Sequence, residues 1–184
     1  APFLGDQSVI KSEPGDAPFF APEKGIDAYC TPHNETSTGV AIKPYKPAGA
    51  DDDAIVVIDA TSGSGGLDVD LSQVDVYYFS PQKCFASDGG LWVAIMSPKA
   101  IARAEEIKAS SRYIPAFLDL VTAIENSRLD QTYNTPALAT IYLMNEQISW
   151  FNQNGGLKWC VCRTSESSSV IYDWAEKSSY ATPY

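Results

Sequence analysis

The 184-residue sequence predicts an α/β fold built on a mostly parallel sheet flanked by helices. Three observations support this prediction. Short runs of β-branched residues come before the helical segments, the most apolar run is continuous, and loops of small residues follow the strands. A continuous apolar run is typical of a strand that a parallel sheet buries on both faces. The functional loops of such a sheet lie at the carboxyl ends of its strands.

The expected strands occupy the first part of the chain. Five prolines within residues 1–35 interrupt any long periodic element, so only short strands are expected there. The central strand is the apolar run AIVVID at residues 54–59, which leads into a loop of Thr, Ser and Gly. The full set of expected strands is residues 8–10, 28–30, 39–42, 54–59, 74–80 and 91–96.

The expected helices occupy the second part of the chain. Ser97-Pro98 and Thr135-Pro136 each combine an N-capping side chain with a proline at the first helical position. Apolar residues then recur at helical spacing, and Asn154-Gly155-Gly156 ends one such stretch. We expect one helix to begin at residue 98 and others to span residues 115–126, 136–154 and 157–176.

Composition and charge exclude several classes of protein. Apolar residues make up 45% of the chain and charged residues 20%, as in ordinary globular domains. No run approaches the ~18 apolar residues of a membrane span, so no membrane partner is expected. The net charge of −10 disfavours a nucleic-acid surface, because phosphates would be repelled. No Cys or His spacing fits a zinc site, so no metal is expected.

Several polar residues have an ordinary structural interpretation. The acidic run at residues 51–53 is interpreted as a solvated loop, with a metal site as the alternative. Cys160 and Cys162 are expected to pack in a core, and free thiols suit a reducing cytoplasm. His33, the only histidine, is expected to be a loop side chain, with substrate contact as the alternative. Arg128 is expected to be solvated or to bind a substrate anion.

Two residues at strand ends suggest cofactor chemistry. Asp59 ends the central strand, and Lys83 follows the next strand between Phe79 and Phe85. A desolvated lysine is a nucleophile that can form a Schiff base with an aldehyde, and a carboxylate can pair with a pyridine nitrogen. These two groups are what a pyridoxal-phosphate site needs. Spacing alone leaves the alternatives open, since a strand-end aspartate often forms a turn and a loop lysine is often solvated.

Four motifs in order make the chain resemble the phosphoserine aminotransferases, which belong to class V of the fold-type-I aminotransferases. The motifs are HNETSTG at residues 33–39, VIDATSG at 57–63, YFSPQKCFASDGGLW at 78–92 and QTYNTP at 131–136. The resemblance implies part of the large cofactor-binding domain at residues 1–150. It also implies a linking helix and the start of a small carboxyl-terminal α/β domain at residues 151–184.

The resemblance implies a role for six residues. Lys83 would be the Schiff-base lysine and the base that moves the Cα proton, and Asp59 would pair with the pyridine nitrogen of pyridoxal 5'-phosphate. Thr36 would hydrogen-bond the cofactor, and Gln82 would contact its phosphate region. Asn134 and Thr135 would reach the phosphate in the neighbouring subunit of a homodimer, so the active sites would be shared.

The implied reaction moves an amino group from L-glutamate to 3-phosphohydroxypyruvate, giving O-phosphoserine and 2-oxoglutarate in serine biosynthesis. One alternative is another class-V enzyme, such as an alanine–glyoxylate aminotransferase or a cysteine desulfurase. The chain could also be a non-catalytic fragment that associates only with its missing half, or a binding module with Lys83 on its surface. Family members are longer and this sequence lacks an initiator Met, so we expect a fragment or a processed product.

Overall fold

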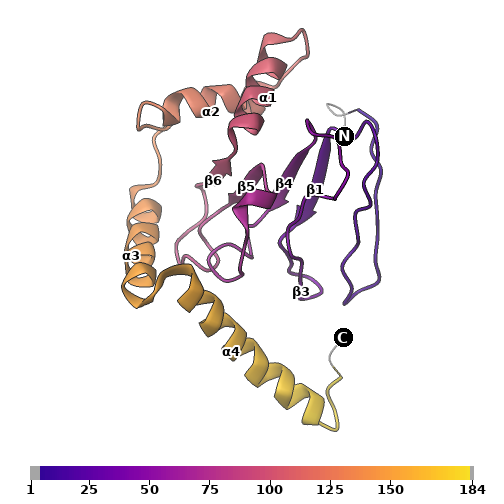
Figure 1. Ribbon diagram of the computed structural model, residues 1–184. Coiled ribbons are helices and arrows are strands. Elements are labelled where there is room, and N and C mark those ends of the chain that lie inside the picture. The colour runs from indigo at the N-terminus through magenta and orange to yellow at the C-terminus, as the bar shows by residue number, and fades with distance from the viewer. Residues whose placement is uncertain (1–4, 183–184) are drawn as a thin grey trace.

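The computed structural model describes residues 5–182, which form an α/β fold around a four-stranded sheet (Figure 1). The strand order is β1-β4-β5-β6. β1 runs parallel to β4 and β4 parallel to β5, whereas β6 is antiparallel to β5. The strands are β1 (Ala28–Pro32), β4 (Ile55–Asp59), β5 (Val76–Phe79) and β6 (Val93–Met96). The mostly parallel sheet predicted from the sequence is therefore confirmed.

The register of the three parallel strands brings their last residues level with one another. Pro32 pairs with Asp59, and Asp59 pairs with Tyr78. The loops that follow these strands gather at the lower end of the sheet in Figure 1. One of them contains a short antiparallel hairpin, β2 (Asn34–Glu35) with β3 (Val40–Ala41). The loop after β4 leads to the 3-10 turn η1 (Leu71–Gln73).

The hydrophobic core lies against one face of this sheet. Its buried members are Val56, Ile58, Ala60, Tyr77 and Phe79. The prediction that β4 is buried on both faces is wrong for the described residues. Side chains alternate along a strand, and the burial of β4 alternates between half-buried and buried. Only one face of the strand is therefore fully covered.

Two helices lie at the end of the sheet opposite the strand-end loops (Figure 1). α1 (Pro98–Ala109) begins as predicted, because the Ser97 side chain accepts a hydrogen bond from the Ala100 N–H and proline follows the cap. The predicted second helix is divided into η2 (Ala116–Leu118) and α2 (Leu120–Ser127). Asp119 divides them, since its carboxylate caps α2 at the Val121 N–H and also pairs with Lys108.

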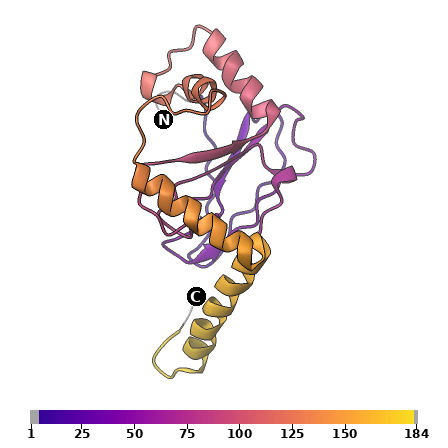
Figure 2. The same cartoon turned by 90° about the vertical axis from the view of Figure 1, so that its left-hand side faces the viewer.

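The last two helices follow one another almost directly. α3 (Leu138–Asn154) ends at Gly155, which has the left-handed φ of +117° that favours glycine. α4 (Gly156–Lys177) starts at the next residue. Figure 2 shows α3 crossing in front of the sheet and α4 leaving it. No helix among residues 5–182 has both the length and the apolar character needed to cross a membrane.

Two local predictions are wrong. Residues 8–10 form no strand and are exposed, since their segment is not paired with the sheet. Thr135 is not a helix cap, because α3 begins at Leu138 with Ala137 before it and no side chain caps its first turn. Pro136 restricts the backbone of the residue before it, but it does not determine which residue caps the helix that begins at Leu138.

Candidate active site

The Asp59 carboxylate lies at the end of β4 and is held by two hydrogen bonds. Its Oδ1 accepts from the Thr61 N–H at 3.0 Å, and its Oδ2 accepts from the Tyr78 hydroxyl at 3.1 Å. Tyr78 is the cross-strand neighbour of Asp59, so the register of the sheet brings the two groups together. Burial, and after it the Asp59 carboxylate, raises the pKa of Tyr78 to about 12. The hydroxyl therefore remains a hydrogen-bond donor to the carboxylate at neutral pH.

Thr36 and Asp59 come from neighbouring loops that a polar network connects. The Thr36 hydroxyl donates to Ser62 Oγ at 2.9 Å, and the Asn34 amide donates to the same oxygen at 3.0 Å. Ser62 in turn donates to the Asn34 carbonyl at 3.1 Å. The backbone N–H of His33 donates to the Asp59 carbonyl at 2.8 Å. The loop after β1 and the loop after β4 are thus joined by backbone and side-chain hydrogen bonds.

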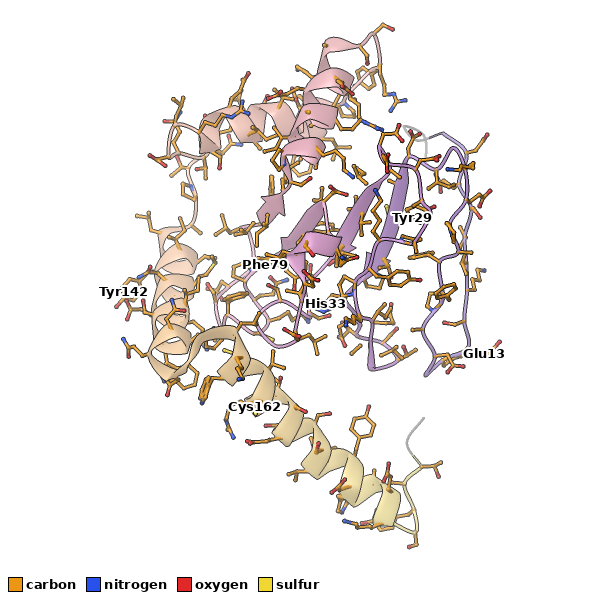
Figure 3. The ribbon with its side chains drawn as sticks, in the orientation of Figure 1. Glu13, Tyr29, His33, Phe79, Tyr142 and Cys162 are labelled. Carbon is orange, nitrogen blue, oxygen red and sulfur yellow. The ribbon has the colours of Figure 1, made fainter. Side chains whose placement is uncertain are left out.

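His33 lies beneath these loops, where its ring is only 2% exposed. His33 lies in the bend between β1 and β2, which agrees with the predicted loop position, and its burial gives no support to substrate contact. The Nδ1 atom lies 3.0 Å from the Tyr77 hydroxyl and the Nε2 atom 3.2 Å from the Asp68 carbonyl. Burial lowers the pKa of His33. Figure 3 shows His33 and Phe79 toward the same end of the sheet.

Lys83 and Gln82 lie on the loop after β5, and both side chains are exposed. The prediction that flanking aromatic residues desolvate Lys83 is wrong for the described chain. Phe79 and Phe85 stack on each other with their ring centroids 4.9 Å apart, and both belong to the core or pack against it. The aromatic rings therefore hold the base of the loop in place, and the lysine remains at the surface.

The loop that carries Lys83 is closed by its own hydrogen bonds and fastened to α3. Ser80 Oγ donates to the Leu91 carbonyl at 2.6 Å, and the Ser87 N–H donates to the Pro81 carbonyl at 3.2 Å. Ser87 Oγ donates to the Thr140 carbonyl in the first turn of α3 at 2.6 Å. These contacts fix the loop at the carboxyl end of β5, where it is the neighbour of the loop that follows Asp59.

Asn134 and Thr135 are not brought into this group of residues. They lie on the segment between α2 and α3, where both are exposed and line an open surface pocket with residues 130–133 and Pro136. The Thr132 hydroxyl donates to the Asn134 carbonyl at 2.6 Å. This bond shapes the backbone of the segment and leaves both predicted side chains facing outward.

The remaining singled-out residues have structural partners. Asp51 pairs with Lys24 at 2.6 Å, in keeping with a surface loop. The Arg128 guanidinium, at the end of α2, forms an ion pair at 3.1 Å with Glu105 of α1. Cys160 is buried as predicted, whereas Cys162 is exposed, because positions two apart on a helix point to different faces.

The residues that sequence reasoning missed are Tyr78, Ser62 and Asn34. Each lies inside one of the family-like motifs, yet none is charged or a usual nucleophile. The signal that could have found Tyr78 is cross-strand register, which places it level with Asp59. Ser62 and Asn34 become visible only when the two loops are placed side by side, because they are 28 residues apart in the sequence.

The arrangement provides a fixed carboxylate, a hydroxyl on the adjoining loop and an accessible amine on the next loop along the sheet. α/β folds bind their ligands at the carboxyl-terminal ends of the parallel strands and on the loops that follow them. A carboxylate suits a protonated ring nitrogen, and an exposed lysine suits an aldehyde. The groups that the chain presents therefore fit pyridoxal phosphate.

Comparison with known proteins defines the class. The sequence model of the aminotransferase class-V family matches residues 24–173, and the chain belongs to this family. It is 60% identical to the phosphoserine aminotransferase of Nocardioides sp. (strain ATCC BAA-499 / JS614) over 185 residues, covering 100% of this chain and 50% of the relative. It is 56% identical to that of Rhodococcus jostii (strain RHA1) over 183 residues, covering 100% of this chain and 49% of the relative.

A solved structure shows the same fold. The phosphoserine aminotransferase of Cytophaga hutchinsonii ATCC 33406 superposes with a TM-score of 0.76 at 25% identity, covering 92% of this chain and 46% of that chain. The fold is thus that of about one half of a class-V aminotransferase. The chain spans about half the length of the curated relatives that it matches.

Proposed function

We propose that the protein containing this chain is a phosphoserine aminotransferase that uses pyridoxal 5'-phosphate. It would move an amino group from L-glutamate to 3-phosphohydroxypyruvate, giving 2-oxoglutarate and O-phosphoserine, the amino-transfer step of serine biosynthesis. The observation that carries the proposal is the 60% identity to a phosphoserine aminotransferase across the whole chain. The carboxylate of Asp59, at the end of β4, and the amine of Lys83, on the loop after the adjacent strand β5, support the same chemistry.

In this proposal Asp59 holds the cofactor ring and Thr36 and Gln82 orient it. When bound, pyridoxal phosphate supplies an electron-poor ring that takes up the electrons released at the substrate's Cα. The two hydrogen bonds from Thr61 and Tyr78 orient the Asp59 carboxylate, which suits a positively charged partner. Thr36 would contact the ring from the neighbouring loop, and Gln82 would contact the phosphate region.

Lys83 performs two tasks in this proposal. Its amine would hold the cofactor aldehyde covalently in the resting enzyme. Once the substrate amine has replaced it, the freed Lys83 amine would take the proton from the substrate's Cα and deliver it to the carbon that was the cofactor's aldehyde carbon. Its exposed position in the described chain supports access by a substrate, and the closed loop beneath it fixes the backbone that carries the amine.

The proposed partner is a second copy of the protein. Asn134 and Thr135 would bind the cofactor phosphate in the neighbouring subunit, so that each site is shared in a homodimer. Their exposure on a segment away from Asp59 supports a role outside their own chain's site. The four cysteines are all unpaired, which supports a cytoplasmic location. Residues 151–184 would link the large domain to a small carboxyl-terminal domain.

The test uses the full-length protein. It should be yellow when purified, and added glutamate should bleach the visible absorption of the cofactor. Phosphohydroxypyruvate should then restore this absorption, and glyoxylate should not. A colourless protein that takes up no pyridoxal phosphate, or recovery with glyoxylate alone, would overturn the proposal.

A further inference from the structure

Ser62 makes three side-chain hydrogen bonds that join two loops. Its Oγ accepts from the Thr36 hydroxyl at 2.9 Å and from the Asn34 amide at 3.0 Å, and it donates to the Asn34 carbonyl at 3.1 Å. A serine hydroxyl has one proton and two lone pairs. Ser62 therefore uses its whole hydrogen-bonding capacity on the loop that carries Thr36.

The backbone around Ser62 is fixed on both sides. On one side, the Thr61 N–H donates to the Asp59 carboxylate at 3.0 Å. On the other side, Gly63 packs against His33 so closely that a Cβ at position 63 would lie 2.8 Å from the ring Nδ1. Since His33 is buried and hydrogen-bonded at both ring nitrogens, it cannot yield easily. The Ser62 hydroxyl is thus held at a constant position relative to Asp59.

Thr36 has the opposite character. It is exposed and lies at the turn between the two short strands of a hairpin, each of which has two residues. Two-residue strands give little stability of their own. Within residues 5–182, its hydroxyl has one hydrogen-bond partner, which is Ser62. The position of the Thr36 hydroxyl therefore depends on the better-fixed serine.

We propose that Ser62 is a positioning residue of the active site. It transfers the rigidity of the Asp59 loop to Thr36, so that the hydroxyl and the carboxylate face the cofactor in a constant relative geometry before it binds. A site that is ordered in advance avoids the entropy cost of ordering on binding. This inference rests on the proposed function, in which Thr36 and Asp59 contact pyridoxal phosphate.

The test is a double-mutant cycle on the full-length protein, stripped of cofactor and titrated with pyridoxal phosphate. Thr36→Val should raise the Kd about tenfold, and Ser62→Ala should raise it about three- to tenfold. If Ser62 acts through Thr36, the Thr36→Val/Ser62→Ala protein should bind no more weakly than Thr36→Val alone. Ser169→Ala, at an exposed serine of α4, is the matched control and should leave the Kd unchanged.

A second variant separates positioning from folding. Ser62→Cys keeps the shape of the side chain but forms weaker hydrogen bonds, so it should raise the Kd in wild-type Thr36 protein and not in Thr36→Val. Independent, multiplying effects of the two substitutions would overturn the positioning role, and so would an unchanged Kd in both Ser62 variants. Either result leaves the proposed function intact if the wild-type protein binds the cofactor. Failure of the wild-type protein to bind overturns both.

Discussion

The strand-end region and the segment between α2 and α3 differ in how their polar side chains are held. At the strand ends, the carboxylate of Asp59 and the hydroxyl of Thr36 are each tied to neighbours within the chain. In the segment of residues 128–137, Asn134 and Thr135 are exposed, and the nearby Thr132 hydroxyl donates to a backbone carbonyl. The first region is arranged by hydrogen bonds within its own chain, whereas the polar side chains of the second are exposed.

This difference separates the residues of the proposed site into two groups. The strand-end groups should matter within each subunit, because their geometry is already set by register and hydrogen bonds. The outward-facing groups should matter only when another subunit is present. Each region can therefore be disabled separately.

The largest effect is expected from removing the amine beside the strand ends. Lys83→Ala should lower transamination by about 10³-fold or more, because both the covalent attachment and the proton transfer are lost. The measurement is the rate of glutamate-dependent bleaching, with intact mass to detect covalent cofactor after reduction. Lys158→Ala, an exposed lysine on α4, should behave as wild type. Normal turnover without Lys83 would remove it from the site.

The outward-facing segment should show its effect across subunits. Replacing both Asn134 and Thr135 with alanine should weaken cofactor binding by about 10²-fold, because two hydrogen bonds to a phosphate are lost. A purified hybrid dimer of this variant with Lys83→Ala contains one intact shared site, so it should regain about half of the wild-type activity. A hybrid as inactive as its parents would show that each site belongs to one chain.

A smaller effect is expected from the hydroxyl that orients Asp59. Tyr78→Phe removes its hydrogen bond to the carboxylate and should raise the Kd for pyridoxal phosphate about five- to tenfold. Since the pKa of Tyr78 is raised to about 12, the wild-type hydroxyl stays protonated and the ratio of the two Kd values should be constant up to a pH of about 10. Tyr142→Phe, on the exposed side of α3 in Figure 3, is the control. Equal Kd values for Tyr78→Phe and wild type would exclude the orienting role.

The smallest effect concerns the support beneath the strand ends. Burial lowers the pKa of His33 from 6.5, so the unfolded chain binds a proton more readily than the folded one. The part of the free energy of unfolding that depends on neutral His33 is therefore present above pH 6.5, and it is lost as the pH falls through the lowered pKa. We expect the His33 resonance to titrate below 6.5, and the melting temperature to fall as the pH is lowered from 6.5 through this range. A midpoint at or above 6.5 would contradict this prediction.

Sequence reasoning predicted the sheet well because its signals are local. The strand predicted at residues 54–59 and the helix cap predicted at Ser97 each depend on a few neighbouring residues, and both are confirmed. The carboxyl-terminal glycine of α3 was also predicted correctly, since a left-handed backbone favours glycine. The helix start at Thr135 failed because proline restricts its neighbour without deciding where the helix begins.

Side-chain environments were harder to predict. The exposure of Lys83 depends on whether Phe79 and Phe85 pack on the lysine or on each other, and no local pattern decides this. The burial of His33 depends on contacts with Tyr77 and Asp68, which are 44 and 35 residues away. The roles of Lys83, Asp59, Thr36, Gln82, Asn134 and Thr135 in catalysis or cofactor binding stay predictions.

α4 is attached to the rest of the structure near its start. Cys160 is buried near its start, and Thr164 Oγ1 donates to the Gly66 carbonyl at 2.6 Å, in the loop that begins just after Asp59. Beyond Thr164 the helix extends about 20 Å to Lys177, at a rise of 1.5 Å per residue. If α4 turned with the Gly66 loop as a rigid body, a tilt of ten degrees would move the far tip of α4 by about 3.5 Å. A small displacement of the loop near the Asp59 carboxylate would then produce a larger displacement at the far end of α4.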